Sequence, residues 1–301
     1  MPKIKYQDFK FRPASLALIE TAIKIIVEYQ QQGFDLTLRQ LYYQFVSRDV
    51  IPNTQKSYKN LGSIVNDARL AGLIDWDTIV DRTRELRTLS HWNDPSDIVK
   101  ACAKQFNIDR WARQKYRPEV WIEKDALLGV FERVCRELDV PLFSCRGYTS
   151  QSEMWRAAQR MLAYHRRKQT PIIFHFGDHD PSGKDMSRDI VDRIELFTGK
   201  SLEFERLALN MDQVDQYAPP PNPAKITDSR ASAYIAEFGD ESWELDALEP
   251  AVLAALVRAA IEGVVDQDRM NEATAEQTRH RETLSLVADR FEDVETFLWS
   301  E

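Results

Sequence analysis

Residues 171–185 read Pro-Ile-Ile-Phe-His-Phe-Gly-Asp-His-Asp-Pro-Ser-Gly-Lys-Asp. The nearly continuous apolar run from Ile172 to Phe176 is typical of a strand buried on both faces of a parallel sheet. Gly177 ends the strand, and the turn residues 181–183 lead into a helix expected over residues 184–197. This segment predicts a strand–loop–helix unit of an α/β protein.

Two acids lie at the carboxyl end of this strand. Asp178 and Asp180 are two positions apart, so in an extended chain their carboxylates point the same way. Open α/β sheets bind ligands at this end of a strand, and paired carboxylates with few other ligands suit Mg²⁺ (or Mn²⁺). We expect a divalent-cation site here. His179, between the acids, is expected to point away from them, and His175 to belong to the core.

Strand–helix alternation continues on the N-terminal side. Strands are expected at residues 119–122 and 141–145, and helices at residues 126–138 and 151–167. Such alternation predicts a doubly wound parallel sheet with its functional loops along one edge. Glu123 follows the first strand, so it should meet Asp178 and Asp180 at that edge. Three carboxylates could hold one or two ions that stabilise the attacking or leaving oxygen in phosphoryl transfer.

The N-terminal third has three helix-like segments and two strand-like ones. The helices are expected at residues 12–32, 37–48 and 54–71, and short strands at residues 72–76 and 79–84. This order predicts a winged helix-turn-helix, whose third helix commonly enters the major groove. In the second helix, Tyr42 lies on the apolar stripe, whereas Tyr43 is expected in solvent, one turn from Arg39.

Charge divides the chain unevenly. The net charge is −8, but residues 1–118 carry 19 lysines and arginines against 13 aspartates and glutamates, a net charge of +6. The remainder carries −14, so only the N-terminal part is suited to a polyanion. Four basic residues on the expected docking elements are candidate DNA contacts: Lys56, Lys59, Arg82 and Arg84. The alternative is an ordinary solvated basic face.

We expect three domains. They are a winged-helix DNA-binding domain over residues 1–116, a metal-binding catalytic domain over 117–265 and an acidic helix over 266–301. Glu244 and Asp246 alternate in a segment that suits an edge strand near the same cleft, where they would either face solvent or help hold a second metal. Lys124 and Lys184, next to the acids, are candidate phosphate contacts.

Three motifs carry a family resemblance. Glu123 after a strand, the Arg146-Gly147-Tyr148 turn and the Asp178–Gly183 loop together resemble the Toprim domain of topoisomerases, primases and some nucleases. The Asp-x-Asp-Pro-x-Gly form is most similar to the topoisomerase VI A subunit and the meiotic double-strand-break transesterase, and other features resemble bacterial and phage Toprim proteins of unassigned function. That family has an Arg-x-x-Tyr-Tyr motif in a preceding winged helix, and Arg39–Tyr43 is similar to it.

The resemblance implies an enzyme that cleaves double-stranded DNA by transesterification. Tyr43 would be the nucleophile and would form a 5′-phosphotyrosyl link, with Mg²⁺ on Glu123, Asp178 and Asp180. It also implies a homodimer, in which tyrosine and metal come from different protomers, and a separate ATPase subunit for strand passage. Arg39 and Arg146 are candidates to neutralise the scissile phosphate, because a guanidinium can grip two oxygens.

Two alternatives stay open. The nuclease subunit of Wadjet-type plasmid defence has the same layout and hydrolyses DNA without needing the tyrosine, so this chain could be a metal-dependent nuclease. It could also be a non-catalytic DNA-binding module. Three widely separated cysteines without metal-ligand spacing, no signal-peptide pattern and no apolar run of membrane length predict a cytoplasmic protein.

Overall fold

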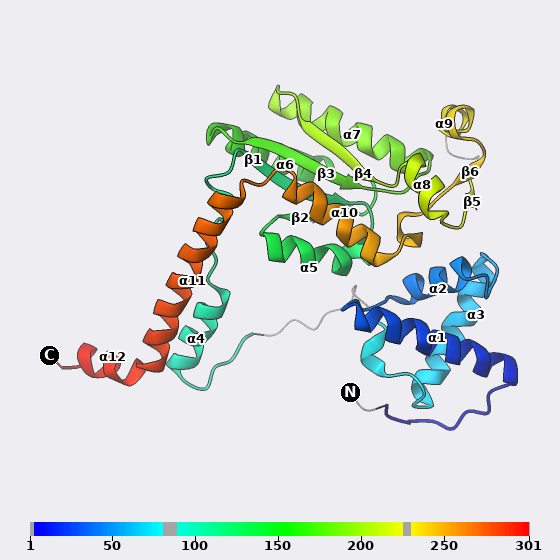
Figure 1. Cartoon of the computed structure of the whole chain (residues 1–301), viewed down its shortest axis with the longest axis horizontal. Coiled ribbons are helices and arrows are strands. Elements are labelled where there is room, and N and C mark those ends of the chain that lie inside the picture. The colour runs from blue at the N-terminus through cyan, green and yellow to red at the C-terminus, as the bar shows by residue number, and fades with distance from the viewer. Residues whose placement is uncertain (1–2, 81–88, 225–229, 301) are drawn as a thin grey trace.

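The computed structural model describes residues 3–80, 89–224 and 230–300. Figure 1 shows a helical N-terminal unit, a central α/β part and a helical arm that carries the C-terminus. The N-terminal unit consists of α1 (Pro13–Gln31), α2 (Leu38–Ser47) and α3 (Gln55–Leu70), close to the predicted ranges. Among the described residues, no helix is both long and apolar enough to cross a membrane.

The centre of the molecule is a four-stranded parallel sheet with the order β2-β1-β3-β4, which confirms the predicted α/β class. Its strands are β1 (Tyr116–Ile122), β2 (Leu142–Ser144), β3 (Thr170–Phe176) and β4 (Glu203–Ala208). Ile122 pairs in register with both Ser144 and Phe176, so three neighbouring strands end together. Glu123 and Gly177 therefore leave the sheet side by side.

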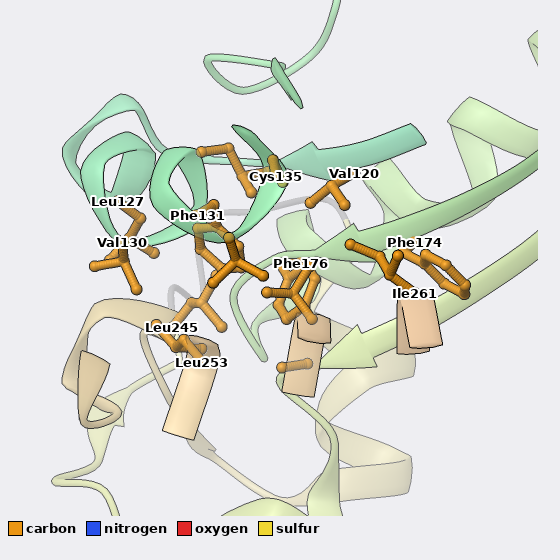
Figure 2. Close-up of a cluster of buried hydrophobic side chains, with 14 of the residues drawn as sticks. Val120, Leu127, Val130, Phe131, Cys135, Phe174, Phe176, Leu245, Leu253 and Ile261 are labelled. Atoms are coloured by element: carbon orange, nitrogen blue, oxygen red, sulfur yellow. The ribbon is translucent and has the colours of Figure 1, made fainter. Parts of the chain in front are cut away.

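Helices cover both faces of this sheet. α5 (Leu128–Leu138) and α10 (Pro250–Glu262) pack on one face, and α6 (Gln151–Arg166) and α7 (Pro181–Thr198) on the other. Successive strand residues point to opposite faces, so Val120 and Ile122 join the core with α5 while Trp121 joins the core with α6. Figure 2 shows the first of these cores, where the rings of Phe131 and Phe176 lie 4.5 Å apart between centroids.

Shorter elements follow the sheet. They are α8 (Met211–Tyr217), α9 (Ala231–Phe238) and an antiparallel pair, β5 (Asn222–Pro223) and β6 (Glu241–Ser242). Trp243 and His179 then exchange backbone hydrogen bonds of 2.8 and 2.9 Å, which hold a 3₁₀ turn, Leu245–Ala247, against the loop after β3. The edge strand expected at Glu244 and Asp246 is thus wrong, although both residues do reach that loop.

The arm is formed by α4 (Pro95–Gln105), α11 (Gln267–Asp289) and α12 (Phe291–Leu298). α4 was not predicted; it lies in the range expected for the winged-helix domain but packs along α11, away from α1–α3 (Figure 1). The helical C-terminal segment expected from the sequence is confirmed as α11 and α12. Gln277 of α11 accepts the backbone N–H of Ile108 at 3.0 Å, which fixes the arm to the segment leading into β1.

The first predicted wing strand, residues 72–76, is wrong. A 3₁₀ turn begins at Trp76, because the Asp75 carboxylate caps it by accepting a backbone N–H two residues on at 3.0 Å. The second predicted wing strand falls mostly outside the described residues, and so do Arg82 and Arg84. The structure therefore describes a three-helix unit without assigning it a wing.

The three-helix unit packs against the central part through α2 and the Leu245–Ala247 turn. Ala247 belongs to the same buried cluster as Leu41 of α2. Asn53 donates to the side-chain oxygen of Asn222 at 2.7 Å, and the Tyr29 hydroxyl donates to Glu249. These contacts place α2 beside the residues that follow β3.

Candidate active site

Glu123 and Asp178 meet at the carboxyl edge of the sheet, as predicted. Because β1 and β3 end in register, Glu123 donates its N–H to the Phe176 carbonyl at 2.9 Å, and its carboxylate turns toward the neighbouring loop. There, Oε2 of Glu123 accepts the backbone N–H of Asp178 at 2.8 Å, across 55 residues of sequence. The pair is held by strand register and by this one hydrogen bond.

Two glycines of the motif leave room for the Glu123 carboxylate. A Cβ at Gly183 would lie 2.2 Å from the Asp178 carbonyl oxygen and 3.1 Å from Glu123 Oε2. A Cβ at Gly177 would lie 3.0 Å from the same carboxylate oxygen. Real Cβ contacts are not this close, so the loop needs glycine at Gly183 in order to close around Glu123.

Asp180 has a structural task at the same edge. It is the N-cap of α7, in extended conformation, and its Oδ1 accepts the N–H of Gly183 at 2.6 Å. Capping of this kind satisfies a backbone donor that the first turn of a helix leaves unpaired. One oxygen of Asp180 is therefore committed to the helix, whereas Glu123 contacts Asp178 through the backbone N–H of that residue.

The Lys124 ammonium lies among three carboxylates. Its Nζ is 2.8 Å from Asp178 Oδ2, 2.7 Å from Glu244 Oε2 and 3.2 Å from Asp246 Oδ1. The second Asp178 oxygen accepts the N–H of Leu245 at 2.8 Å, which fixes the carboxylate at both ends. Burial alone would lower the pKa of Lys124, but the acids around it raise the pKa above the ordinary value. Lys124 is thus charged and compensates Asp178.

Arg39 connects this cluster to α2. Its guanidinium pairs with Glu244, and its Nε lies 3.1 Å from Asp246 Oδ2. The same guanidinium donates to the Tyr43 hydroxyl at 3.4 Å. Tyr43, Arg39, the two acids of residues 244–246, Lys124 and Asp178 therefore form one continuous line of side chains.

The prediction that Tyr43 faces solvent is wrong. Only 5% of the residue is exposed, because the Leu245–Ala247 turn covers the face of α2 that an isolated helix would present to water. Tyr42 is buried as expected, and its hydroxyl donates to Asn53 at 2.9 Å. Burial, together with the negative charges of Asp246 and Glu244, raises the pKa of Tyr43. In this arrangement Tyr43 is a protonated phenol.

The acids differ in their protonation. Burial, and next the charge of Asp178, raises the pKa of Glu123 to about 7. Burial also raises the pKa of Asp178 and that of Asp246. For Glu244, burial would raise the pKa, but the ion pairs with Lys124 and Arg39 outweigh it and hold the pKa at about 2. The raised pKa values thus mark Glu123, Asp178 and Asp246 as carboxylates whose negative charge is disfavoured by burial.

This donor set fits a divalent cation of the magnesium type in part. Within the described ranges, no three His, Cys, Asp or Glu side chains are gathered as a ready metal cluster. Mg²⁺ commonly uses one or two carboxylates together with water and phosphate oxygens, and the Glu123–Asp178 pair offers that number. The raised pKa of Glu123 marks a place where added positive charge is favourable. For Asp178 to act as a ligand, Lys124 must release its Oδ2.

The other predicted site residues lie around this centre. Arg146 follows β2 at the rim, where its Nε is 2.6 Å from Asp125 and its side chain is 74% exposed. Lys56 and Lys59 are exposed on α3. Lys184 stacks its ammonium 5.1 Å from the ring centre of Phe238, so it points away from the acids.

The two histidines behave as expected. His179 is fully buried and points away from the acids, with its Nδ1 2.7 Å from the Tyr234 hydroxyl and its ring packed against Trp243. His175 lies in the core, 3.0 Å from the hydroxyl of Ser187. Strand alternation, read from the sequence, was sufficient to exclude both from the acidic cluster.

One residue of the site was missed. Arg206 on β4 donates to the carbonyl oxygens of Gly177 at 2.9 Å, Asp178 at 2.5 Å and Gly183 at 3.0 Å. It therefore ties together the loop that carries the acids. β4 was not predicted, so nothing placed Arg206 near this loop. Arg206 follows Leu202 and Phe204 at intervals of two residues, with a polar residue between each pair. This alternation is the signal that could have found the strand.

No protein-family model matches this chain, and none of the curated proteins does either. The likeness to the topoisomerase VI A subunit therefore rests on the residues quoted above. The parallel α/β sheet is compatible with a Toprim-like fold.

Proposed function

We propose that this chain is a metal-dependent enzyme that cleaves double-stranded DNA, with Tyr43 as the nucleophile. The observation that carries the proposal is the line of side chains from the Tyr43 hydroxyl through Arg39 to the acids at the sheet edge. A candidate nucleophile, a guanidinium and a carboxylate pair lie together, although they come from segments far apart in the sequence. Phosphoryl transfer needs an attacking oxygen, a cation that binds the phosphate, and positive charge at the departing oxygen, which a metal ion on the carboxylates would supply.

The proposed step is a transesterification at one backbone phosphate. The Tyr43 oxygen attacks the phosphorus, its proton passes to solvent or to Glu244, the P–O3′ bond breaks and the 3′ oxygen takes up a proton. The product is a 5′-phosphotyrosyl link and a free 3′ hydroxyl. Mg²⁺ or Mn²⁺ held by Glu123, Asp178 and Asp180 would supply positive charge at the departing oxygen. Arg39 would exchange Glu244 for the phosphate.

The reaction requires a local opening. Tyr43 is 5% exposed, and the Leu245–Ala247 turn packs on α2, so separation of that turn from the helix would give a phosphate fuller access to the hydroxyl. The same movement would free Arg39 from its two acids. We expect DNA to drive it, because the phosphate replaces carboxylates as the partner of the guanidinium.

A homodimer over the duplex and a separate ATPase subunit stay part of the proposal. Within one chain, the Tyr43 hydroxyl accepts from Arg39, which pairs with Glu244. A pair of protomers would cut both strands. Exposed Lys56 and Lys59 on α3 are the proposed contacts to the DNA backbone, within a three-helix unit that we propose acts as the winged helix does in the similar family.

A second candidate function is metal-dependent hydrolysis of DNA. Tyr43 is buried and its pKa is raised, and a buried phenol is a poor nucleophile. Both observations favour hydrolysis, because water is then the nucleophile and the tyrosine need not be activated. In that case Glu123 and Asp178 would serve the same cation, and Tyr43 would only hold Arg39.

The experiment that separates these functions uses supercoiled plasmid, Mg²⁺ or Mn²⁺, and a denaturing stop. The proposal expects protein joined to 5′ DNA ends in the wild type and loss of both adduct and cleavage in Tyr43→Phe. Tyr6→Phe is the control, because it removes the hydroxyl of an exposed tyrosine elsewhere in the N-terminal part. Cleavage that persists in Tyr43→Phe with free 5′ phosphates would establish hydrolysis instead. DNA binding without cleavage under all conditions would leave a binding module.

A further inference from the structure

A cavity of about 380 Å³ lies beside Tyr43, between the three-helix unit and the central part. Its walls include Tyr42 and Tyr43 of α2, Tyr58 of α3 and, from the opposite side, Asn222 of β5. Its size falls in the range of small-molecule sites and exceeds that of one nucleobase. None of the roles described above uses this cavity.

Three tyrosine rings form one wall. The ring centroids of Tyr42 and Tyr43 are 5.4 Å apart, and those of Tyr42 and Tyr58 are 5.3 Å apart, at interplanar angles of 59° and 76°. The Tyr42 hydroxyl is fixed by its bond to Asn53, so this ring is held in place. Every nucleobase has a π face, and stacking on aromatic side chains is the main way in which proteins hold unpaired bases.

Amides and a cation complete the cavity. Asn53 donates to Asn222 Oδ1 at 2.7 Å, and the NH₂ of Asn222 makes no hydrogen bond to another described residue. Amide groups pair with the edges of bases. Arg39, whose side chain is 46% exposed, borders the cavity and can meet a phosphate. A stacking wall, an amide and a guanidinium are together suited to a nucleotide.

We infer that this cavity takes one unpaired nucleobase, whose own phosphate lies toward Arg39 and the Tyr43 hydroxyl. The inference rests on the proposed function, since it identifies the scissile phosphate as that of an unpaired nucleotide. The same chemistry could come from two sources: a nucleotide extruded from DNA, or a free mononucleotide.

The test measures binding without cleavage, in EDTA. The probe is a DNA duplex with a single bulged 2-aminopurine, whose fluorescence falls when the base stacks; the fully paired duplex is the comparison. The wild type should quench the bulged probe and bind it more tightly than the paired duplex. Tyr58→Leu should weaken binding of the bulged probe by about 5- to 150-fold, the range that one stacked base supplies. Asn60→Ala, on the same helix and away from the cavity, should bind as the wild type does.

Asn222→Ala provides a second variant on the opposite wall, in case Tyr58→Leu does not fold; it should also weaken binding of the bulged probe. Competition by 2-aminopurine riboside monophosphate at micromolar concentration would assign the cavity to a free nucleotide, and no competition would assign it to DNA. Equal binding of both duplexes by the wild type, Tyr58→Leu and Asn222→Ala would overturn the inference. Because no metal is present, this outcome is independent of whether a Tyr43 adduct forms.

Discussion

Lys124 supplies positive charge to the buried acids of the site. Its ammonium lies within 3.2 Å of Asp178, Glu244 and Asp246, which come from two separate stretches of chain. Buried carboxylates are tolerated only when paired, because an isolated charge in the interior costs several kcal/mol. The protein thus carries its own cation next to the position where a divalent ion is proposed. We expect metal binding and the Lys124–Asp178 ion pair to compete.

The variant Lys124→Met should be strongly destabilised. It leaves Asp178 and Asp246 buried with one cation fewer, at a cost of about 3–5 kcal/mol in the free energy of unfolding. Urea unfolding at neutral pH measures this cost, and Mg²⁺ should recover part of it. Lys59→Met, on the exposed face of α3, is the control and should change stability by less than about 0.5 kcal/mol. Equal stability of the two variants would show that the acids do not depend on Lys124.

His175 gives the protein a defined acid sensitivity. Burial, and next the charge of Arg206, lowers its pKa from 6.5 to about 3. Below pH 6.5 the His175 imidazole is therefore protonated in the unfolded chain, whereas in the folded chain it stays neutral down to about pH 3. The contribution of His175 to stability is fully present above pH 6.5 and should fall by at most about 1.4 kcal/mol per pH unit below it. Chemical denaturation from pH 7 to 4 tests this, and His175→Leu should show a shallower slope over that range. An identical slope would exclude His175 as the cause.

At the scale of elements, the start of α7 brings the acids together. Its cap, Asp180, and its third residue, Gly183, close the loop over Glu123, and Arg206 of β4 holds the carbonyl oxygens of the same loop. Helix capping, close backbone approach and a buried guanidinium thus act on one short segment. The geometry of Glu123 and Asp178 depends on this segment more than on any single contact between the acids.

The variant Gly183→Ala should disturb this segment. Its Cβ would lie 2.2 Å from a backbone oxygen, so the loop must shift, at a cost of roughly 1–3 kcal/mol and with loss of cleavage. Gly263→Ala is the matched control, since its Cβ would meet its nearest atom at 3.3 Å and its φ is −67°. Unfolding curves of the two variants make the comparison. Gly183→Ala with wild-type stability and activity would contradict the close packing described here.

Periodicity predicted the elements whose burial is local and failed where the partner comes from elsewhere. The apolar stripes of α1, α2 and α3 and the run of β3 were sufficient to place them within a few residues. The environment of Tyr43 could not be predicted in this way. It depends on Glu244, which pairs with Arg39 and lies 205 residues from Arg39 in the sequence. The prediction of the first wing strand, residues 72–76, was wrong because a turn capped by Asp75 satisfies backbone polar groups that a strand would otherwise pair.

At the scale of the whole molecule, the site lies at a junction between two parts. The three-helix unit brings Arg39 and Tyr43, and the central sheet brings Glu123, Lys124 and Asp178. Among the described residues, the polar contacts across the junction include those of Asn53 with Asn222, Tyr29 with Glu249 and Arg39 with Glu244. Interfaces of this kind within a chain commonly permit relative motion. Such motion is what the proposed chemistry needs in order to expose Tyr43.

Mass spectrometry tests the covalent step most directly. The protein reacts with plasmid and Mg²⁺ or Mn²⁺, the reaction is stopped with denaturant, and the protein is then digested with nuclease and trypsin. Trypsin cleaves after Arg39 and Arg48, so Tyr42 and Tyr43 fall in one peptide, residues 40–48, and fragmentation distinguishes them. The proposed transesterification should leave a nucleotide attached through its 5′ phosphate to Tyr43. DNA cleaved with free 5′ phosphates while this peptide stays unmodified, or an adduct on any other residue, would contradict it.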